Sequence, residues 1–225
     1  MKNFRIKIAQ LVSIVLIFLI ITISLNAQSG QFGLRFMPTF SKFDIKTSTG
    51  GTIEGKGTFG LGFGAFLGYS FSEYIGIQGE VIYSSYSQKY RELEIEREVK
   101  LKYINIPLLL TLNTGKSRAI NLNVVAGPQI GISVGSNLFT TGDDGTGSQA
   151  VLSVKKGDLG FAYGAGLDFG LNSTRNIRLG IGYRGVVGVF DISDNNSTIE
   201  TNSFYILEKS HVKVDAAYIG LSIVF

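Results

Sequence analysis

Hydrophobic residues recur at every second position over most of the chain, and they do so in eight separate stretches. The clearest stretch, residues 58–71, places aromatic and aliphatic side chains on one face and glycines on the other. A period of two indicates a β-strand, because successive side chains of a strand point to opposite faces. We predict strands, each long enough to cross a bilayer when tilted, at residues 31–43, 58–71, 74–90, 93–112, 119–135, 157–171, 176–190 and 211–225.

The connections between these strands alternate in length. Those at residues 72–73, 113–118 and 172–175 are short, whereas those at 44–57, 90–92, 136–156 and 191–210 are longer or protrude. Short periplasmic turns and long external loops are typical of bacterial outer-membrane barrels. We therefore expect an all-β fold: an eight-stranded antiparallel transmembrane up-and-down β-barrel in the outer membrane, with both termini in the periplasm.

The chain ends on an apolar strand whose last residue is aromatic. Such a strand would be an aggregation-prone edge in a soluble protein, whereas in a closed barrel it pairs with the first strand and faces lipid. This last segment resembles the C-terminal assembly signal of outer-membrane barrels at Tyr218, Gly220, Ile223 and Phe225. The expected partners are therefore the barrel-assembly machinery during insertion and outer-membrane lipid.

The N-terminal segment has the composition of a secretory signal peptide. Three basic residues precede a long apolar run, and Ala27 offers a small residue for cleavage. An uncleaved signal-anchor helix is the alternative, because the apolar run is long. We favour cleavage, since a barrel gains nothing from a retained helix, and expect a signal peptide at residues 1–27 and an outer-membrane barrel domain at residues 28–225.

The positive charge of the chain, formally +4, lies mostly in this segment. The segment holds three of the 21 lysine and arginine residues and none of the 17 acidic residues, so the rest of the chain is close to neutral. The basic balance therefore gives no reason to expect a nucleic-acid partner. The chain has no cysteine, and its 29 glycines with only three prolines fit neither collagen nor a disordered linker.

Residues 101–110 of the predicted fourth strand carry a family resemblance; they read Leu-Lys-Tyr-Ile-Asn-Ile-Pro-Leu-Leu-Leu. This stretch resembles the Tyr-aliphatic-Glu-Ile-Pro-Leu-Leu-Leu element of the PorT-like outer-membrane β-barrel family. With the glycine-rich second strand and the C-terminal strand, the resemblance covers nearly the whole mature chain. It implies an eight-stranded outer-membrane barrel, and one branch of the family is tied to a protein-secretion apparatus. Asn105 stands where the family often has a carboxylate, and Pro107 predicts a bulge where the strand changes its facing.

Several polar residues fall on the strand phase that faces away from lipid: Arg35, Gln78, Glu80, Lys102, Asp168, Arg178 and Arg184. An eight-stranded barrel is just wide enough for side chains to fill, and buried charges must be paired. We therefore favour a salt-bridged plug that stabilises the wall over a proton or ion path, which would use the same residues. Asp168 and Arg178 flank a short turn and are expected to lie across from one another.

Two motifs suggest chemistry but fit it poorly. A hydrolase acting on outer-leaflet lipid could use Ser210 and His211, yet neighbours on a strand point to opposite faces. The acidic, glycine-rich loop at residues 142–147 lacks the spaced acids and the closing glutamate of a calcium loop. We therefore expect no catalytic residue, no metal and no cofactor.

The strand pattern around residue 95 continues past the length that a bilayer requires, which predicts a projecting hairpin. Its residues include Tyr90, Leu93, Glu94, Ile95, Glu96 and Arg97. A projecting edge can accept a strand from a partner, whereas its dense charge can equally block such pairing. This hairpin is the best candidate interaction surface in the sequence.

These patterns favour a non-enzymatic outer-membrane protein that acts through its external loops or as an accessory subunit of an envelope complex, with a link to protein secretion as one form of that role. The alternatives are an outer-membrane lipid-modifying hydrolase and a small ion channel. The three hypotheses place the working residues in the loops, around His211 and in the barrel interior, respectively.

Overall fold

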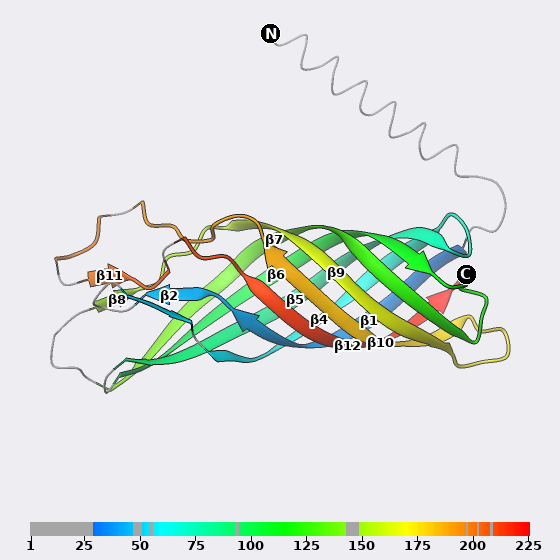
Figure 1. The fold of residues 1–225 in the computed structure, drawn as a ribbon, viewed down its shortest axis with the longest axis horizontal. Coiled ribbons are helices and arrows are strands. Elements are labelled where there is room, and N and C mark those ends of the chain that lie inside the picture. The colour runs from blue at the N-terminus through cyan, green and yellow to red at the C-terminus, as the bar shows by residue number, and fades with distance from the viewer. Residues whose placement is uncertain are drawn as a thin grey trace, which may run out of the picture.

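The structure, a computed structural model, describes residues 29–46, 51–54, 56–92, 95–142, 149–196, 198–201, 203–207 and 209–225. Its main feature is a closed barrel of antiparallel strands (Figure 1). The strands in order round the barrel are β1 (Ser29–Lys42), β12 (Lys213–Val224), β10 (Ile177–Gly188), β9 (Gly157–Gly170), β7 (Ile120–Thr141), β6 (Ile95–Asn113), β5 (Ile75–Glu92) and β4 (Lys56–Ser70). The predicted eight-stranded antiparallel barrel is confirmed, whereas the expected signal peptide lies outside the described residues.

The barrel closes where the first strand meets the last. Phe32 of β1 lies opposite Ile223 of β12 on one side and opposite Leu67 of β4 on the other. Closure gives every strand two neighbours, so that the backbone groups within a bilayer are satisfied without water. Among the residues that the structure describes, no helix is long and apolar enough to cross a membrane.

The outer wall of the barrel is apolar. Leu34, Phe63 and Leu67 leave 59%, 60% and 64% of their surface exposed, and they point away from the interior. Water would penalise such a band, whereas the hydrocarbon of a bilayer solvates it. The lipid-facing phase of the strands is therefore the aromatic and aliphatic phase, as the alternation predicts.

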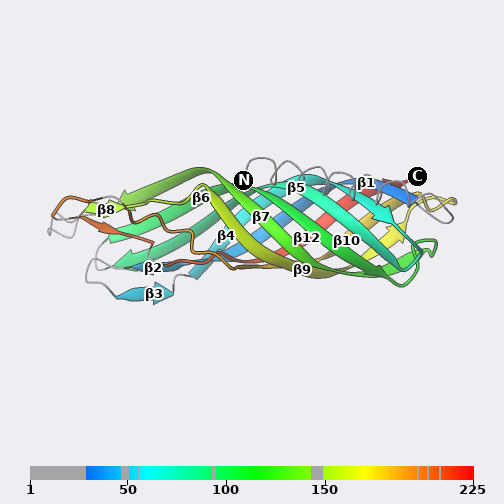
Figure 2. The same cartoon turned by 90° about the horizontal axis from the view of Figure 1, so that it is seen from above.

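The two ends of the barrel differ, and we name them by their connections. The short-turn end carries the turns at residues 71–74, 114–119 and 171–176, whereas the long-loop end lies opposite, on the left in Figures 1 and 2. Four short strands belong to the long-loop end: β2 (Asp44–Lys46), β3 (Thr52–Glu54), β8 (Gln149–Val151) and β11 (Ser203–Tyr205). β2 pairs with β3 in antiparallel fashion, and β8 pairs with β11 in parallel fashion.

Polarity inverts along β6 between the barrel and the long-loop end. Every second residue from Ile95 to Thr111 is buried, so the facing of the strand never changes. Towards the short-turn end the apolar residues of β6, such as Leu108, are the exposed ones. Towards the long-loop end the apolar residues, such as Leu101, are the buried ones. The apolar residues change sides because the surroundings of the wall change from lipid to water.

The bulge predicted at Pro107 is wrong. The register is the same on both sides of this residue, because Asn105 pairs with Ile82 and Leu108 pairs with Gly79. The irregularity lies instead where Lys102 and Tyr103 face β7, which contains an extra residue there. Beyond this bulge β7 continues to Thr141, past the predicted end at residue 135.

Gly127 permits close approach of two strands, and its replacement by alanine is expected to destabilise the barrel. The new Cβ would lie 2.0 Å from the carbonyl oxygen of Leu108 on β6, and overpacking of this kind costs about 1–3 kcal/mol. Urea titration in lipid vesicles measures the free energy of unfolding. Gly79→Ala is the matched control, because no heavy atom lies within 4 Å of that Cβ position. Equal losses at the two glycines would contradict this account.

Candidate functional site

Glu80 of β5 lies inside the barrel and binds two arginines. Its Oε1 accepts a hydrogen bond from Arg35 Nη1 at 2.5 Å and one from Arg184 Nη2 at 2.9 Å. The side chains of Glu80, Arg35 and Arg184 are 1%, 8% and 2% exposed. Gln78 also donates to Glu80. The structure thus brings together four of the seven predicted interior residues in what we call the ionic layer: Arg35, Gln78, Glu80 and Arg184.

The ionic layer holds two guanidinium groups for one carboxylate. The guanidinium carbon of Arg35 lies 4.3 Å from the ring centre of Phe66 and 4.5 Å from that of Tyr218. The faces of the two rings attract the cation and supply the stabilisation that a second carboxylate would otherwise give. Tyr218, an expected assembly-signal residue, therefore also packs inside the barrel.

The other residues of the expected assembly signal divide between the two faces of β12. Ile223 and Phe225 face outward with 50% and 75% exposure, and Gly220 is half-buried on the inner phase beside Arg35. Recognition by assembly machinery stays a prediction.

A second polar layer lies nearer the short-turn end. The carboxylate of Asp168 accepts hydrogen bonds from the side-chain amides of Asn121 at 3.2 Å and Asn123 at 2.8 Å. Arg178 donates instead to backbone carbonyl oxygens, those of Lys116, Arg118, Asp168 and Arg175. The two residues therefore lie near each other as expected, but their side chains do not share an ion pair, because the guanidinium of Arg178 donates to backbone carbonyl oxygens instead.

Lys116 enters the same layer from the turn at residues 114–119. Its Nζ donates to Gln31 Oε1 at 3.0 Å. Burial lowers the pKa of Lys116, the charge of Asp168 opposes this effect and that of Arg178 adds to it. The cost of keeping Lys116 charged in the fold is therefore present in full at low pH, begins to fall as the pH rises through the lowered pKa, and is gone above the ordinary pKa of lysine.

Asn105 organises a third layer on the other side of the ionic layer. Its amide nitrogen donates to Ser84 Oγ at 3.1 Å and to Tyr86 Oη at 2.8 Å, and its oxygen accepts from Gln129 Nε2 at 3.2 Å. Asn105 therefore faces the interior. A cavity of about 20 Å³, room for about one water molecule, separates this layer from Arg184.

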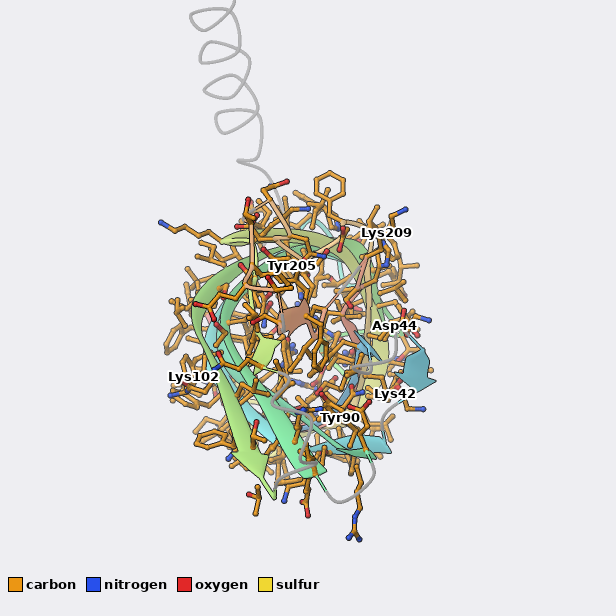
Figure 3. The ribbon with its side chains drawn as sticks, turned by 90° about the vertical axis from the view of Figure 1, so that its left-hand side faces the viewer. Lys42, Asp44, Tyr90, Lys102, Tyr205 and Lys209 are labelled. Carbon is orange, nitrogen blue, oxygen red and sulfur yellow. The ribbon has the colours of Figure 1, made fainter. Side chains whose placement is uncertain are left out.

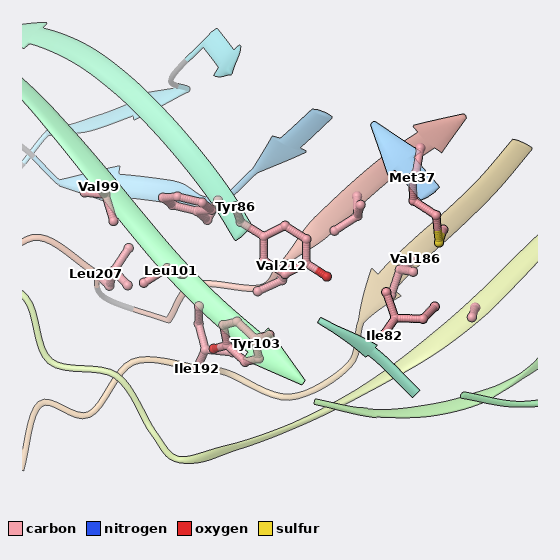
Figure 4. Close-up of a cluster of buried hydrophobic side chains, with 14 of the residues drawn as sticks. Met37, Ile82, Tyr86, Val99, Leu101, Tyr103, Val186, Ile192, Leu207 and Val212 are labelled. Carbon is pink, nitrogen blue, oxygen red and sulfur yellow. The ribbon is translucent and has the colours of Figure 1, made fainter. Parts of the chain in front are cut away.

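An apolar cluster closes the barrel interior at the long-loop end, and we call it the mouth core. It consists of Ile45, Val99, Leu101, Ile192, Ile206 and Leu207, each fully buried. Figure 4 shows Val99, Leu101, Ile192 and Leu207 among the neighbouring buried side chains. The last three come from the connection between β10 and β12, and they belong to the same buried cluster as Ile45 of β2 and two residues of β6. Full burial of such a side chain contributes roughly 1.5–3 kcal/mol, so this connection is held firmly.

Lys102 does not face the interior, and its assignment to the plug is wrong. It alternates with the buried residues of β6 and lies opposite Gly135 of β7 on the outer surface (Figure 3). The error has a physical origin: the apolar residues of β6 change sides along the strand, so polarity does not reveal facing there.

The predicted interaction hairpin turns much of its surface towards the molecule itself. Tyr90, Ile95 and Arg97 are at least 95% buried, whereas Glu96 faces solvent. Arg97 donates to Glu92 at 2.7 Å and lies 5.3 Å from the ring centre of Phe204 on β11. Leu93 and Glu94 lie outside the described residues. The inner face of the hairpin therefore supports the mouth core, and its outer face carries the charge.

The motifs considered for chemistry have other uses where the structure describes them. The buried hydroxyl of Ser210 donates to the backbone oxygen of Asp44, and His211 is half-buried. Most of the loop at residues 142–147 lies outside the described residues. In the described part of the chain, no group of three or more histidine, cysteine, aspartate or glutamate residues is placed to hold a metal ion.

The predicted interior network did not include several interior residues, above all Phe66, Asn105, Asn121 and Asn123. The asparagines carry a signal, since they are polar residues on an inward phase. The three mouth-core residues between β10 and β12 also carry a sequence signal of burial, because isoleucine and leucine are unusual in an exposed loop.

Comparison with known proteins places the chain among membrane barrels. The family model for the outer membrane protein beta-barrel domain matches residues 13–207. This is the broader family, and it does not distinguish the PorT-like branch that the sequence resembles. No protein of curated function matches the sequence.

The solved structures to which the chain is similar include three outer-membrane proteins. OprG from Pseudomonas aeruginosa shares 16% identity with a TM-score of 0.52, over 88% of this chain and 96% of that one. Neisserial surface protein A shares 13% identity with a TM-score of 0.44, over 85% and 96%. Ail of Yersinia pestis shares 14% identity with a TM-score of 0.42, over 88% and 100%. At these identities the likeness concerns the fold alone, and the two lower scores carry no further argument.

Replacement of Glu80 by alanine is expected to destabilise the barrel by about 3–5 kcal/mol, because two buried guanidinium groups lose their carboxylate. Glu96→Ala is the control, since the exposed Glu96–Lys89 pair contributes at most about 1 kcal/mol. Urea titration in lipid vesicles measures both losses. A loss at Glu80 no larger than that at Glu96 would mean that the ionic layer does not support the wall.

Proposed function

Because this chain belongs to the family of outer membrane protein beta-barrel domains, we propose that it is a non-enzymatic outer-membrane protein whose working surface is the long-loop end. In this proposal the long-loop end faces the exterior, and both termini lie in the periplasm once residues 1–27 are removed. The protein serves as a binding or accessory subunit of an envelope complex. A PorT-like link to protein secretion is one form of that role.

The observation that carries this proposal is the mouth core. Loops that only connect strands need no apolar core, yet here the connection between β10 and β12 buries Ile192, Ile206 and Leu207 completely. The core holds the projecting parts of β5 and β6 in a fixed position. A surface that is already ordered loses little conformational entropy when it binds, which favours recognition.

The filled interior argues against a channel. The ionic layer occupies the middle of the barrel, and the mouth core lies over it. An eight-stranded barrel has room for side chains but not for an open aqueous path beside them. The interior therefore supports the wall in this proposal.

The geometry around Ser210 argues against a hydrolase. A nucleophilic serine needs a hydroxyl that a base can reach, whereas the Ser210 hydroxyl is buried and hydrogen-bonded to a backbone carbonyl. Ser210 serves to anchor the segment before β12 to β2.

The outer face of the β5–β6 hairpin presents fixed charges. Glu96 pairs with Lys89 at 3.5 Å, and Glu98 pairs with Lys100 at 3.3 Å. Partial burial favours a raised pKa for Glu98, but hydrogen bonds from Ser87 and Lys100 outweigh it and hold the pKa below its ordinary value. The face therefore stays charged at neutral pH and is suited to select partners by electrostatic complementarity.

Reversal of this charge is expected to weaken a complex without unfolding the barrel. The double variant Glu96→Lys/Glu98→Lys should reduce the partner recovered after mild cross-linking in native outer membranes about tenfold. Glu73→Lys, the same change in an exposed turn at the short-turn end, is the control and should leave recovery unchanged. Loss of the partner with the control variant alone would move the working surface to the opposite end.

Purified protein is expected to give no stepwise conductance in planar bilayers, because the ionic layer and the mouth core fill the interior. A general porin in the same bilayers shows that the assay works. Reproducible conductance steps from the wild-type protein would contradict the plug and favour the small-channel hypothesis.

A further inference from the structure

β7 projects beyond β9 and leaves one of its backbone edges open. Pairing with β9 ends where Ile132 lies opposite Gly157, and one more hydrogen bond joins Ser133 N to Lys156 O. Pairing with β6 continues on the other side as far as Thr141. Within the described part of the chain, residues 134–141 therefore have a β-sheet neighbour on one side only; we call them the β7 edge.

The β7 edge lacks the charged residues and prolines by which proteins usually protect such edges. It reads Val-Gly-Ser-Asn-Leu-Phe-Thr-Thr, without a charged residue or a proline, and the bulge lies at its base. The opposite margin of the projecting sheet differs: β5 pairs with β4 as far as Lys89, and only residues 90–92, two of them charged, extend beyond. The β7 edge is therefore the longer and the less protected of the two.

A cation is held beside this edge. The stem of Lys102 leans over Gly135, with its Cδ 3.7 Å from the position of a Cβ there. The ion pairs of the described residues engage Lys89 and Lys100 but give Lys102 no carboxylate. An added strand would lie about 4.8 Å beyond β7, so a carboxylate side chain on it that extends over Gly135 would approach the Lys102 ammonium group. Further along the edge, Phe139 faces outward and is 50% exposed.

A second copy of the chain does not fit as the occupant. Two barrels in one membrane share the membrane normal, and their symmetry axis is parallel to it. Strands tilted by about 35–45° and related by such an axis cross each other instead of running antiparallel. The occupant is therefore an extended segment of a different protein.

We propose that the β7 edge is a docking site for an extended segment of a partner protein, which adds a strand to the projecting sheet. The segment carries a carboxylate opposite Gly135, where Lys102 meets it, and an apolar side chain opposite Phe139. Main-chain hydrogen bonds supply the affinity in this mode, and the two side chains supply the specificity. The inference rests on the proposed function and names the docking site within it.

Amide hydrogen exchange on the barrel alone in lipid nanodiscs tests whether the edge is free. The edge-facing amides of residues 134–141 should exchange much faster than those of residues 123–126 and 129–132, which are paired on both sides. Equal protection of both segments would show that the chain covers its own edge and would overturn the proposal.

Two synthetic peptides test the chemistry of the occupant. Each alternates threonine and valine, with a central glutamate in one and a central lysine in the other. The glutamate peptide should slow exchange across residues 134–141 and bind up to about fivefold more tightly, the range of an exposed ion pair. Lys102→Glu should reverse the preference. Absence of protection by either peptide at saturating concentration would overturn the proposal.

The variant Asn137→Lys/Phe139→Lys places charges on the edge and should abolish protection by the peptide. Glu73→Lys adds a charge in an exposed turn at the short-turn end, away from Lys102, and should leave binding unchanged. Equal loss in both variants would mean that charge acts without regard to the edge, contrary to the proposal.

A photoreactive residue at position 137 or at position 96, used for cross-linking in native outer membranes, tests docking at the β7 edge separately from the proposed function. A partner segment captured at 137, which also protects residues 134–141 as a synthetic peptide, supports both. A partner captured at 96 alone leaves the proposed function standing but overturns docking at the edge. Capture of lipid alone at both positions overturns both.

Discussion

The closure of β1 against β12 is the constraint on which the rest of the structure depends. In a bilayer an unpaired strand edge costs several kcal/mol for each exposed backbone group, so the sheet has to form a ring. Eight strands make a narrow ring, and its interior must be filled by side chains. Charges placed there must find partners, which explains why Glu80 holds two arginines and why two aromatic rings enclose Arg35.

The constraint weakens where the wall leaves the lipid, and the polarity of the wall inverts there. In the barrel the apolar side chains face outward, whereas around Val99 and Leu101 they face inward and form the mouth core. The same strands thus expose their apolar side chains to lipid at one end and bury them, as a water-soluble protein does, at the other. An edge that lipid would forbid becomes possible beyond the lipid, and β7 has such an edge.

Strand number, order and approximate position could be predicted from the sequence, because alternation, turn residues and the apolar last strand are local signals. The positions of Arg35, Gln78, Glu80 and Arg184 on the inner phase followed from the same alternation. Lys102 did not, because the prediction took polarity as the guide to facing on a strand whose apolar residues change sides. No bulge lies at Pro107 of β6, and the bulge of this region lies in β7 instead. Its position depends on the register between the two strands, which one strand's sequence does not contain.

The sequence by itself determined that this chain forms a membrane barrel with charged residues inside. The period of two and the positions of glycine and aromatic residues are local features that each segment contains. Only the tertiary structure decided which groups meet. Asp168 binds asparagines and Arg178 binds turn carbonyls, although the two lie close together. Phe66 and Tyr218 enclose Arg35 from strands far apart in sequence. Such contacts depend on the stagger of strands round the closed ring, which is set by all the pairings together and not by any one segment.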